Sequence, residues 1–206
     1  MKRIVKKPDV RRMEIILIAK KQFEQKGYAN TSVESIIQEV GIAKGTFYHY
    51  FKAKKDILQA IVEYIGSEME SLFRSIVENN NLTAIEKLQL MIRGPKKKVL
   101  TESPVMEILH KGENRELQEQ LNILTIEHIA PLMAQVFEQG KQEGVFARTV
   151  PVESIQLMLG GSQFVMDSGL FNWSNEKRTA FLKSAQTMLE MMVGAKPGTF
   201  SFILEE

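Results

Sequence analysis

Cationic, aromatic and small residues cluster between positions 44 and 52, and together they offer the chemistry of nucleic-acid contact. They are Lys44, Gly45, Thr46, Tyr48, His49, Tyr50 and Lys52. A helix turns by about 100° per residue, so Phe47 and Phe51 lie within about 40° of each other and form the buried face. The remaining residues then face outward, with Thr46 and Tyr50 at the flanks. Lysines beside exposed aromatic rings suit contact with phosphates and thymine methyl groups.

The preceding residues predict the element that positions this run, namely a helix, a short turn and a second helix. Thr31 and Glu34 have the spacing of a capping box at the start of the first helix. Gly41 stands where that helix must end, since glycine takes a positive φ at little cost. Ile42 can fill the angle between the two helices. The structural alternative is an ordinary helical hairpin in which the tyrosines pack.

Charge is unevenly distributed along the chain. Residues 1–65 hold 13 Lys and Arg against 7 Asp and Glu, whereas residues 66–206 hold 14 against 18. A basic head on an acidic body indicates that the head meets a polyanion, although a solvated charged surface has the same composition. The segment from Arg3 to Lys7 is either a basic arm of this head or a solubilising tail.

Composition limits the other function classes. The 206 residues are 44% apolar and 25% charged, which is ordinary globular composition and excludes disorder throughout. Cysteine is absent, so a disulfide, a thiolate nucleophile and a Cys-ligated metal are excluded. Donors for another metal site cannot be placed together, and we expect neither a metal nor a cofactor.

Targeting and catalytic motifs are also missing from the sequence. An uncharged apolar run of about 18 residues does not occur, so we expect no membrane-spanning helix. The N-terminus lacks the features of a secretory signal, and we expect a cytoplasmic protein. A glycine-rich phosphate loop, a G-x-S-x-G elbow and an H-E-x-x-H motif are absent, which argues against an enzyme.

Helical periodicity dominates the rest of the chain, and no strand pattern occurs. The first helix should end at Gly27 and bury one apolar face. That face comprises Val10, Met13, Ile16, Leu17 and Phe23. A long helix is expected to begin near Lys54 and to end at Asn79, where three asparagines follow one another. Head and body are therefore predicted to be continuous rather than joined by a flexible linker.

The second half of the chain predicts further helices, which gives about nine in all and an all-α fold. One should begin at Thr83, and another should begin with Asn114 as its cap. Pro131 is expected to kink or divide the latter, because proline lacks a backbone donor. Residues 152–171 and residues 174–194 should form the last two long helices, the second of them capped by a serine.

The N-terminal positions, taken together, form a pattern found in a known family. They are Ala19, Phe23, Gly27, Tyr28, Thr31, Ser32, Val33, Ile36, Gly41, Ile42, the run from Lys44 to Phe51, and Lys54. This pattern resembles the N-terminal signature of TetR-type transcriptional regulators. The resemblance implies a three-helix, helix-turn-helix DNA-binding head over residues 1–53. It also implies a larger helical ligand-binding and dimerisation body over residues 54–206, joined to the head through the long helix.

The resemblance further implies a function. The chain would bind double-stranded DNA at a palindromic operator as a homodimer, act as a repressor, and be released by a small-molecule inducer. A transcriptional activator without such an inducer, or a helical protein-interaction module, is the alternative. Binding that weakens steeply with salt would separate a DNA-binding protein from the interaction module.

Site residues carried over from the family concentrate in the head. Those expected to face DNA are Lys44, Gly45, Thr46, Tyr48, His49 and Tyr50, and those expected to contact phosphate are Thr31, Ser32 and Lys54. The sequence departs from the family pattern at Ala43 and Ala53, where the usual capping side chains are lost at about 1 kcal/mol each. It also has Lys55 in place of a usual acidic residue.

Body residues were assigned on chemistry that suits a pocket or an interface. Apolar and histidine side chains suggest a ligand site formed by Met91, Met106, His110, His128, Met133, Met158, Phe164 and Trp173. The family's dimer interface uses the last two long helices. The corresponding residues are Met158, Leu159, Phe181, Ala185, Met188 and Met192. Each of these side chains could instead fill the core of a single chain.

Overall fold

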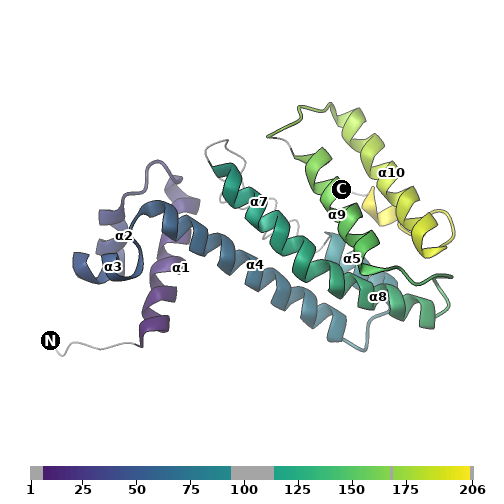
Figure 1. Cartoon of the computed structure of the whole chain (residues 1–206), viewed down its shortest axis with the longest axis horizontal. Helices are drawn as coiled ribbons and strands as arrows, with labels where there is room; N and C mark the ends of the chain where they lie inside the picture. The colour runs from purple at the N-terminus through teal and green to yellow at the C-terminus, as the bar shows by residue number, and fades with distance from the viewer. Residues whose placement is uncertain (1–6, 94–113, 168, 205–206) are drawn as a thin grey trace.

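The computed structural model describes residues 7–93, 114–167 and 169–204, and the regular structure in these ranges is helical throughout. The head and the long helix comprise α1 (Pro8–Lys26), α2 (Val33–Val40), α3 (Lys44–Tyr50) and α4 (Lys54–Glu78). The body adds α5 (Ala84–Arg93), α7 (Arg115–Leu124), the π turn η3 (Thr125–Ile129), α8 (Ala130–Gln142), α9 (Val152–Met166), α10 (Asn175–Val193) and the short η4 (Ser201–Ile203). Figure 1 shows the head at one end of α4 and the other helices gathered towards its far end.

The hydrophobic core of the head extends beyond its own three helices. Phe23, Ile36 and Phe47 from α1, α2 and α3 are fully buried in it. The first three turns of α4 contribute the next layer, and Leu117 and Leu121 of α7 complete the cluster. The head is therefore packed against two body helices rather than attached by α4 alone.

The first helix buries less of its apolar face than the sequence predicts. Pro8 occupies its first turn, where the missing donor costs nothing, and Gly27 ends it at a φ of 79°. Val10, Met13 and Leu17 are exposed, so the prediction that they are buried is wrong. The reason is that α1 packs on α2 and α4 with the face of Ile15, Ala19 and Phe23, whereas these three residues lie on the other side of the helix.

The boundaries of the body helices follow the predicted signals in most places. Thr83 and Glu86 form a capping box at the start of α5, since each accepts a hydrogen bond from the other's backbone N–H at 3.3 and 2.8 Å. These bonds from Thr83 hold the pKa of Glu86 below its usual value. Ser174 caps α10 by accepting from the N–H of Lys177 at 3.3 Å. In contrast, Asn114 stands at the cap position of α7 without a side-chain cap bond.

The predicted break near Pro131 takes the form of a π turn. The helix that begins at Arg115 widens over Thr125–Ile129 and resumes as α8, with proline in its first turn. Proline cannot donate to the carbonyl of Glu127, so the regular α-helical ladder cannot pass this point. The helix after residue 152 ends at Met166, five residues before the predicted end.

A second core holds the body together around the C-terminal residues. Phe146 packs between Phe137 and Phe200 at ring centroid distances of 6.0 and 5.7 Å. Buried Glu190 fixes the chain that follows α10, because its Oε1 accepts from the backbone N–H groups of Gly198 and Phe200 at 2.8 and 3.3 Å. The segment after residue 196, whose structure the sequence did not predict, is thus an integral part of the core.

Candidate nucleic-acid interface and ligand cavity

The second helix of the helix-turn-helix presents the face that its sequence predicts. Phe47 is fully buried and Phe51 is 3% exposed, whereas Tyr48 is 43% exposed. The other side chains predicted to point outward, Lys44, Gly45, His49 and Lys52, are exposed as well, and Thr46 and Tyr50 are half-buried. The predicted orientation of α3 is confirmed, and contact with DNA stays a prediction.

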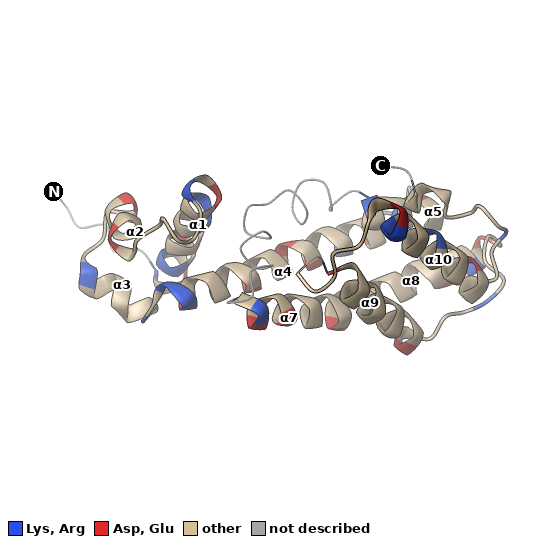
Figure 2. Cartoon of the chain, turned by 90° about the horizontal axis from the view of Figure 1, so that it is seen from above, with Lys and Arg blue, Asp and Glu red and all other residues tan. Residues whose placement is uncertain are grey.

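The charged side chain at the start of α3 is Lys44. Lys44 Nζ lies 5.9 Å from the ring centroid of Tyr48 and 3.8 Å from a carboxylate oxygen of Glu34. Both side chains of the ion pair are 69% exposed, so water screens the attraction and the lysine stays available to a phosphate. Figure 2 shows basic residues on α3, at the end of the head away from the body, and at the start of α4, where the head joins the long helix.

The turn between α1 and α2 differs from the prediction at its capping residue. Ser32, and not Thr31, caps α2: its Oγ accepts from the N–H of Ser35 at 3.0 Å. Thr31 is 1% exposed, and its hydroxyl donates to the carbonyl oxygens of Gly27 and Gln22 at 2.9 and 3.3 Å. The hydroxyl of Thr31 is therefore directed inward, and its contact with phosphate stays a prediction. Ser32 remains exposed beside the helix start.

Lys54 has a role that the sequence did not reveal. Its Nζ donates to the carbonyl oxygens of Tyr28 and Thr31 at 2.7 and 2.9 Å, and it lies 4.2 Å from the centroid of the Tyr28 ring. These contacts join the first residue of α4 to the turn between α1 and α2. Lys54 is therefore a tether between the long helix and the head, and its phosphate contact stays a prediction.

The loss of two helix caps is confirmed. Ala43 and Ala53 occupy the cap positions of α3 and α4, and neither makes a side-chain cap bond. Asp56 compensates in part, since its Oδ2 accepts from the N–H groups of Lys52 and Ala53 at 2.8 and 3.1 Å. The start of α3 has no equivalent among the described residues.

A buried glutamine, also missed by the sequence analysis, fixes α1 against α2. Gln22 is 1% exposed and donates to the Ser35 carbonyl at 3.1 Å and to Glu39 at 2.6 Å, while Ser35 Oγ donates back to it at 2.7 Å. Hydrogen bonds from Lys21 and then Gln22 hold the pKa of Glu39 below its usual value. The sequence signal for this contact was Gln22 itself, a polar residue at a position of α1 that faces the core.

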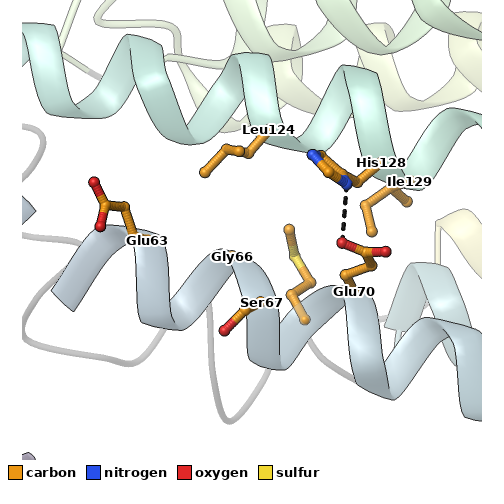
Figure 3. Close-up of a pocket in the computed structure, with 8 residues that line it drawn as sticks. Glu63, Gly66, Ser67, Glu70, Leu124, His128 and Ile129 are labelled. Atoms are coloured by element: carbon orange, nitrogen blue, oxygen red, sulfur yellow. Dashed lines mark ion pairs between the residues drawn. The ribbon is translucent and has the colours of Figure 1, made fainter. Parts of the chain in front are cut away.

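A cavity lies between α4 and the helix that runs through the π turn (Figure 3). Its volume is about 150 Å³, and its lining comprises Glu63, Gly66, Ser67, Met69, Glu70, Leu124, His128 and Ile129. His128 Nδ1 lies 2.9 Å from Glu70 Oε2 across it. The hydrogen bond from Arg74 is the main cause that holds the pKa of Glu70 below its usual value, with the charge of His128 adding to it.

The cavity exists because α4 and α7 run side by side in the same direction. Lys55 pairs with Glu116 at 3.1 Å near one end, and Glu70 pairs with His128 near the other. Between them, a side chain at Gly66 would bring its Cβ to 3.0 Å from Leu124 Cδ1. The glycine therefore permits the close approach of the two helices.

Comparison with known proteins assigns this fold to a family. The family model described as "Bacterial regulatory proteins, tetR family" matches residues 15–61, and the one described as "Tetracyclin repressor-like, C-terminal domain" matches residues 97–187. The chain belongs to the TetR family. It is an all-α transcriptional regulator with an N-terminal helix-turn-helix head and a helical C-terminal body, as the sequence predicted.

Similar TetR-family proteins span nearly the whole chain. The fatty acid metabolism regulator protein of Bacillus subtilis is 26% identical over 88% of this chain and 93% of its own length. The transcriptional repressor KstR2 of Mycobacterium tuberculosis is 22% identical over 80% and 84%. Among solved structures, RolR in complex with resorcinol superposes with a TM-score of 0.61 at 17% identity, covering 96% of this chain and 95% of RolR. A TetR-family regulator from Pectobacterium atrosepticum gives 0.65 at 19%, covering 91% and 98%.

The body residues predicted to bind a ligand are not brought together. In this TetR-family chain only His128 lines the cavity. Met91 and Met133 are buried in the core at 4% and 5% exposure, and Met158 packs against it. Met106 and His110 lie outside the described residues. The α4 side of the cavity was not predicted, although an isolated glycine within a long helix was the available signal.

Phe164 and Trp173 belong to an aromatic cluster at the link between α9 and α10. Trp173 stacks on Phe171 with a centroid distance of 4.9 Å and an interplanar angle of 8°. Phe164 meets the edge of Phe171 at 5.5 Å, and Phe181 lies 5.6 Å from Trp173. The indole N–H donates to the Val165 carbonyl at 2.8 Å. This arrangement gives Trp173 the role of a link anchor.

The last two long helices expose an apolar surface. Leu157 and Phe164 of α9 are 79% and 56% exposed, and Met188 and Met191 of α10 are 59% and 69% exposed. Of the residues predicted at a dimer interface, Met188 is exposed, while Met158, Leu159, Phe181, Ala185 and Met192 are half-buried. The two most exposed residues of this surface, Leu157 and Met191, were not predicted.

Two further features of the described residues bear on partners. Within residues 7–93, 114–167 and 169–204, no group of three or more side chains has the arrangement of a metal site. None of the helices in the same ranges is both long and apolar enough to cross a bilayer.

Proposed function

We propose that this TetR-family regulator is a repressor that binds a palindromic operator as a homodimer and leaves it when a small molecule enters the body. Residues 1–53 would bind the operator, and residues 54–206 would bind the ligand and the second protomer. The observation that carries this proposal is the unbroken course of α4. Its first residue, Lys54, is tethered to the head, and its fifth turn contributes Glu70 to the cavity.

Operator contact is assigned to the exposed face of α3. Two such helices, one from each protomer, would enter successive major grooves about 34 Å apart. Lys44 supplies a cation for phosphate, and the bare backbone at Gly45 permits close approach. Tyr48 and His49 reach base edges, with Thr46 and Tyr50 at the flanks. Exposed Ser32 contacts phosphate at the start of α2.

Dimerisation is assigned to the apolar surface of α9 and α10. Single exposed apolar residues are common, but α9 exposes Leu157 and Phe164 and α10 exposes Met188 and Met191, and exposed apolar residues gathered in this way mark an interface. The pattern on α9 places Gly161 beside Leu157 and Phe164, and its missing side chain leaves open space there. Two copies of these helices would make a four-helix interface.

Release is assigned to a displacement of α7 against α4. A ligand between Gly66 and Leu124 has to separate the two helices, because these residues are already in contact distance. Leu117 and Leu121 of α7 lie in the core of the head, so the displacement reaches the head directly. The changed head separation would no longer match the operator.

The similar proteins support a ligand-responsive regulator without naming this chain's ligand. One relative regulates fatty acid metabolism, and one structural neighbour was solved with resorcinol. Operator binding also places the proposed function in the cytoplasm, and it does not require an enzyme activity or a cofactor.

Selection of genomic DNA fragments by the purified protein at about 0.15 M salt tests the operator, because non-specific binding is weak there. We expect a palindromic site. Tyr48→Ala should lower the affinity for that site at least tenfold while sedimentation still shows a dimer. Binding that is unchanged by Tyr48→Ala would refute the assignment of α3. Failure to recover any site, with a protein partner captured in a salt-insensitive complex, would favour the interaction module.

A further inference from the structure

The polar groups that line the cavity between α4 and the π turn are hydrogen-bond acceptors. Glu63 and Glu70 present carboxylates, which only accept when ionised. Ser67 donates its hydroxyl proton to the Tyr64 carbonyl at 2.8 Å, so its oxygen keeps lone pairs that can accept. His128 directs Nδ1 at Glu70 Oε2 at 2.9 Å, and Nε2 is the ring nitrogen that this contact does not use.

The remaining walls of the cavity are apolar. Met69, Leu124 and Ile129 form them, and Gly66 contributes a bare stretch of helix (Figure 3). A volume of about 150 Å³ is that of a site able to hold a benzene ring. The cavity thus provides space for one small apolar body next to a set of acceptors. A π turn forms one side of it, and π turns are frequent at functional sites.

An acceptor lining selects the ligand by its polar group. A carboxylate or phosphate would be repelled by Glu63 and Glu70. A hydroxyl donates one hydrogen bond but also directs lone pairs at the carboxylates, and those lone pairs would lose their partners. An ammonium group has three donors and no acceptor, so it matches the carboxylates of this lining.

Charge in the surroundings favours the same group. Glu63 has a single ion-pair partner among the described residues, Arg12 at 3.9 Å, and both side chains are about half exposed. Such a pair contributes little, so the carboxylate is available to a ligand. Arg74 contacts Oε1 of Glu70 at 2.7 Å. The other carboxylate oxygen, Oε2, faces His128 across the cavity.

We propose that this cavity binds a small organic amine in its ammonium form, with an apolar body about the size of a benzene ring. The proposal rests on the ligand-responsive function proposed above and specifies the class of ligand. The ammonium group would displace His128 from Glu70 Oε2, and the apolar body would lie against Leu124. Both changes act on the segment that joins α7 to α8.

Benzylamine, benzyl alcohol and benzoate are suitable probes, because they share a ring and differ in polar group. Binding to the full chain can be measured by NMR titration of the His128 ring signals, assigned with His128→Asn. We expect benzylammonium to bind at least about tenfold more tightly than benzyl alcohol, and benzoate not to bind. Glu70→Gln should weaken amine binding about tenfold, the loss expected for one charge-assisted hydrogen bond. Glu63→Gln, two helical turns away on α4, should weaken it less.

Glu78→Gln is the matched control, since Glu78 is an exposed residue of the same helix outside the cavity. It should bind the amine like the unaltered protein. Equal affinity for amine and alcohol, amine binding that both cavity variants retain, or no amine binding would overturn the proposal. Operator binding is measured on the same samples. A protein that binds its operator but not the amine refutes only the ligand class, whereas a protein that binds no operator refutes the proposed function.

Discussion

The tether between Lys54 and the turn of the head can be tested by Lys54→Met, which keeps the length of the side chain and removes its donors. Two hydrogen bonds from a charged group, at 2.7 and 2.9 Å, are lost together with the contact on the Tyr28 ring. A bond from a charged group contributes about 1.5 to 3 kcal/mol when buried, but Lys54 is only half-buried, and water can replace part of what is lost. We expect a loss of about 2 kcal/mol in the free energy of unfolding.

Urea unfolding followed by circular dichroism measures this loss, and operator titration at several salt concentrations completes the assay. Lys55→Met is the control, because among the described residues Lys55 pairs with exposed Glu116 alone, and the change should alter stability by less than about 0.5 kcal/mol. A phosphate contact would behave differently, since it would lower the salt slope of operator binding by about one and leave unfolding unchanged. That second result for Lys54→Met would refute the tether.

Three further changes test other parts of the structure. Leu157→Glu should convert the dimer into a folded monomer in analytical ultracentrifugation, because the side chain is 79% exposed within one chain, whereas Leu90→Glu on α5 should leave the dimer intact. Ala43→Ser should raise the free energy of unfolding by about 1 kcal/mol by capping α3, and Ala29→Ser, which lies at no cap, should not change it. Hydrogen bonds from Gln186 and the backbone N–H groups of Phe200 and Gly198 hold the pKa of Glu190 below its usual value, so its stabilising effect is present above the unfolded pKa and is lost as pH falls through the folded one. Glu190→Gln should therefore destabilise the protein by about 1 kcal/mol at pH 7, and thermal unfolding should show the gap closing towards pH 3.

The orientation of α3 could be predicted from the sequence because it depends on helical geometry alone. Two phenylalanines four residues apart determine which side is buried, and every other residue of the helix follows from them. The ends of α2 and of the long helix were predictable for a similar reason. Gly41 at a φ of 71° and the asparagines after Glu78 act within a few residues of the chain.

The errors concern choices that only tertiary packing makes. Thr31 and Ser32 are both good caps, and the end of α1 decides between them by accepting the threonine hydroxyl. Periodicity indicated that Val10 and Leu17 share an apolar face, but it could not show that α2 and α4 leave this part of α1 uncovered. Of the expected ligand residues that the structure describes, only His128 lines the cavity, because methionine content does not indicate which helices meet.

The pairing of α4 with α7 gives the departure at Lys55 a physical meaning. An acidic residue at this position would repel Glu116, whereas the lysine attracts it at 3.1 Å and draws the start of α7 towards the head. The pair is exposed and contributes little stability. Its effect is to fix where α7 lies along α4. With Leu117 and Leu121 in the head core and His128 on Glu70, α7 is held at both ends of its contact with α4. A helix fixed at one end responds to a ligand by bending away locally. A helix fixed at both ends must move the elements to which it is attached, and one of these is the DNA-binding head.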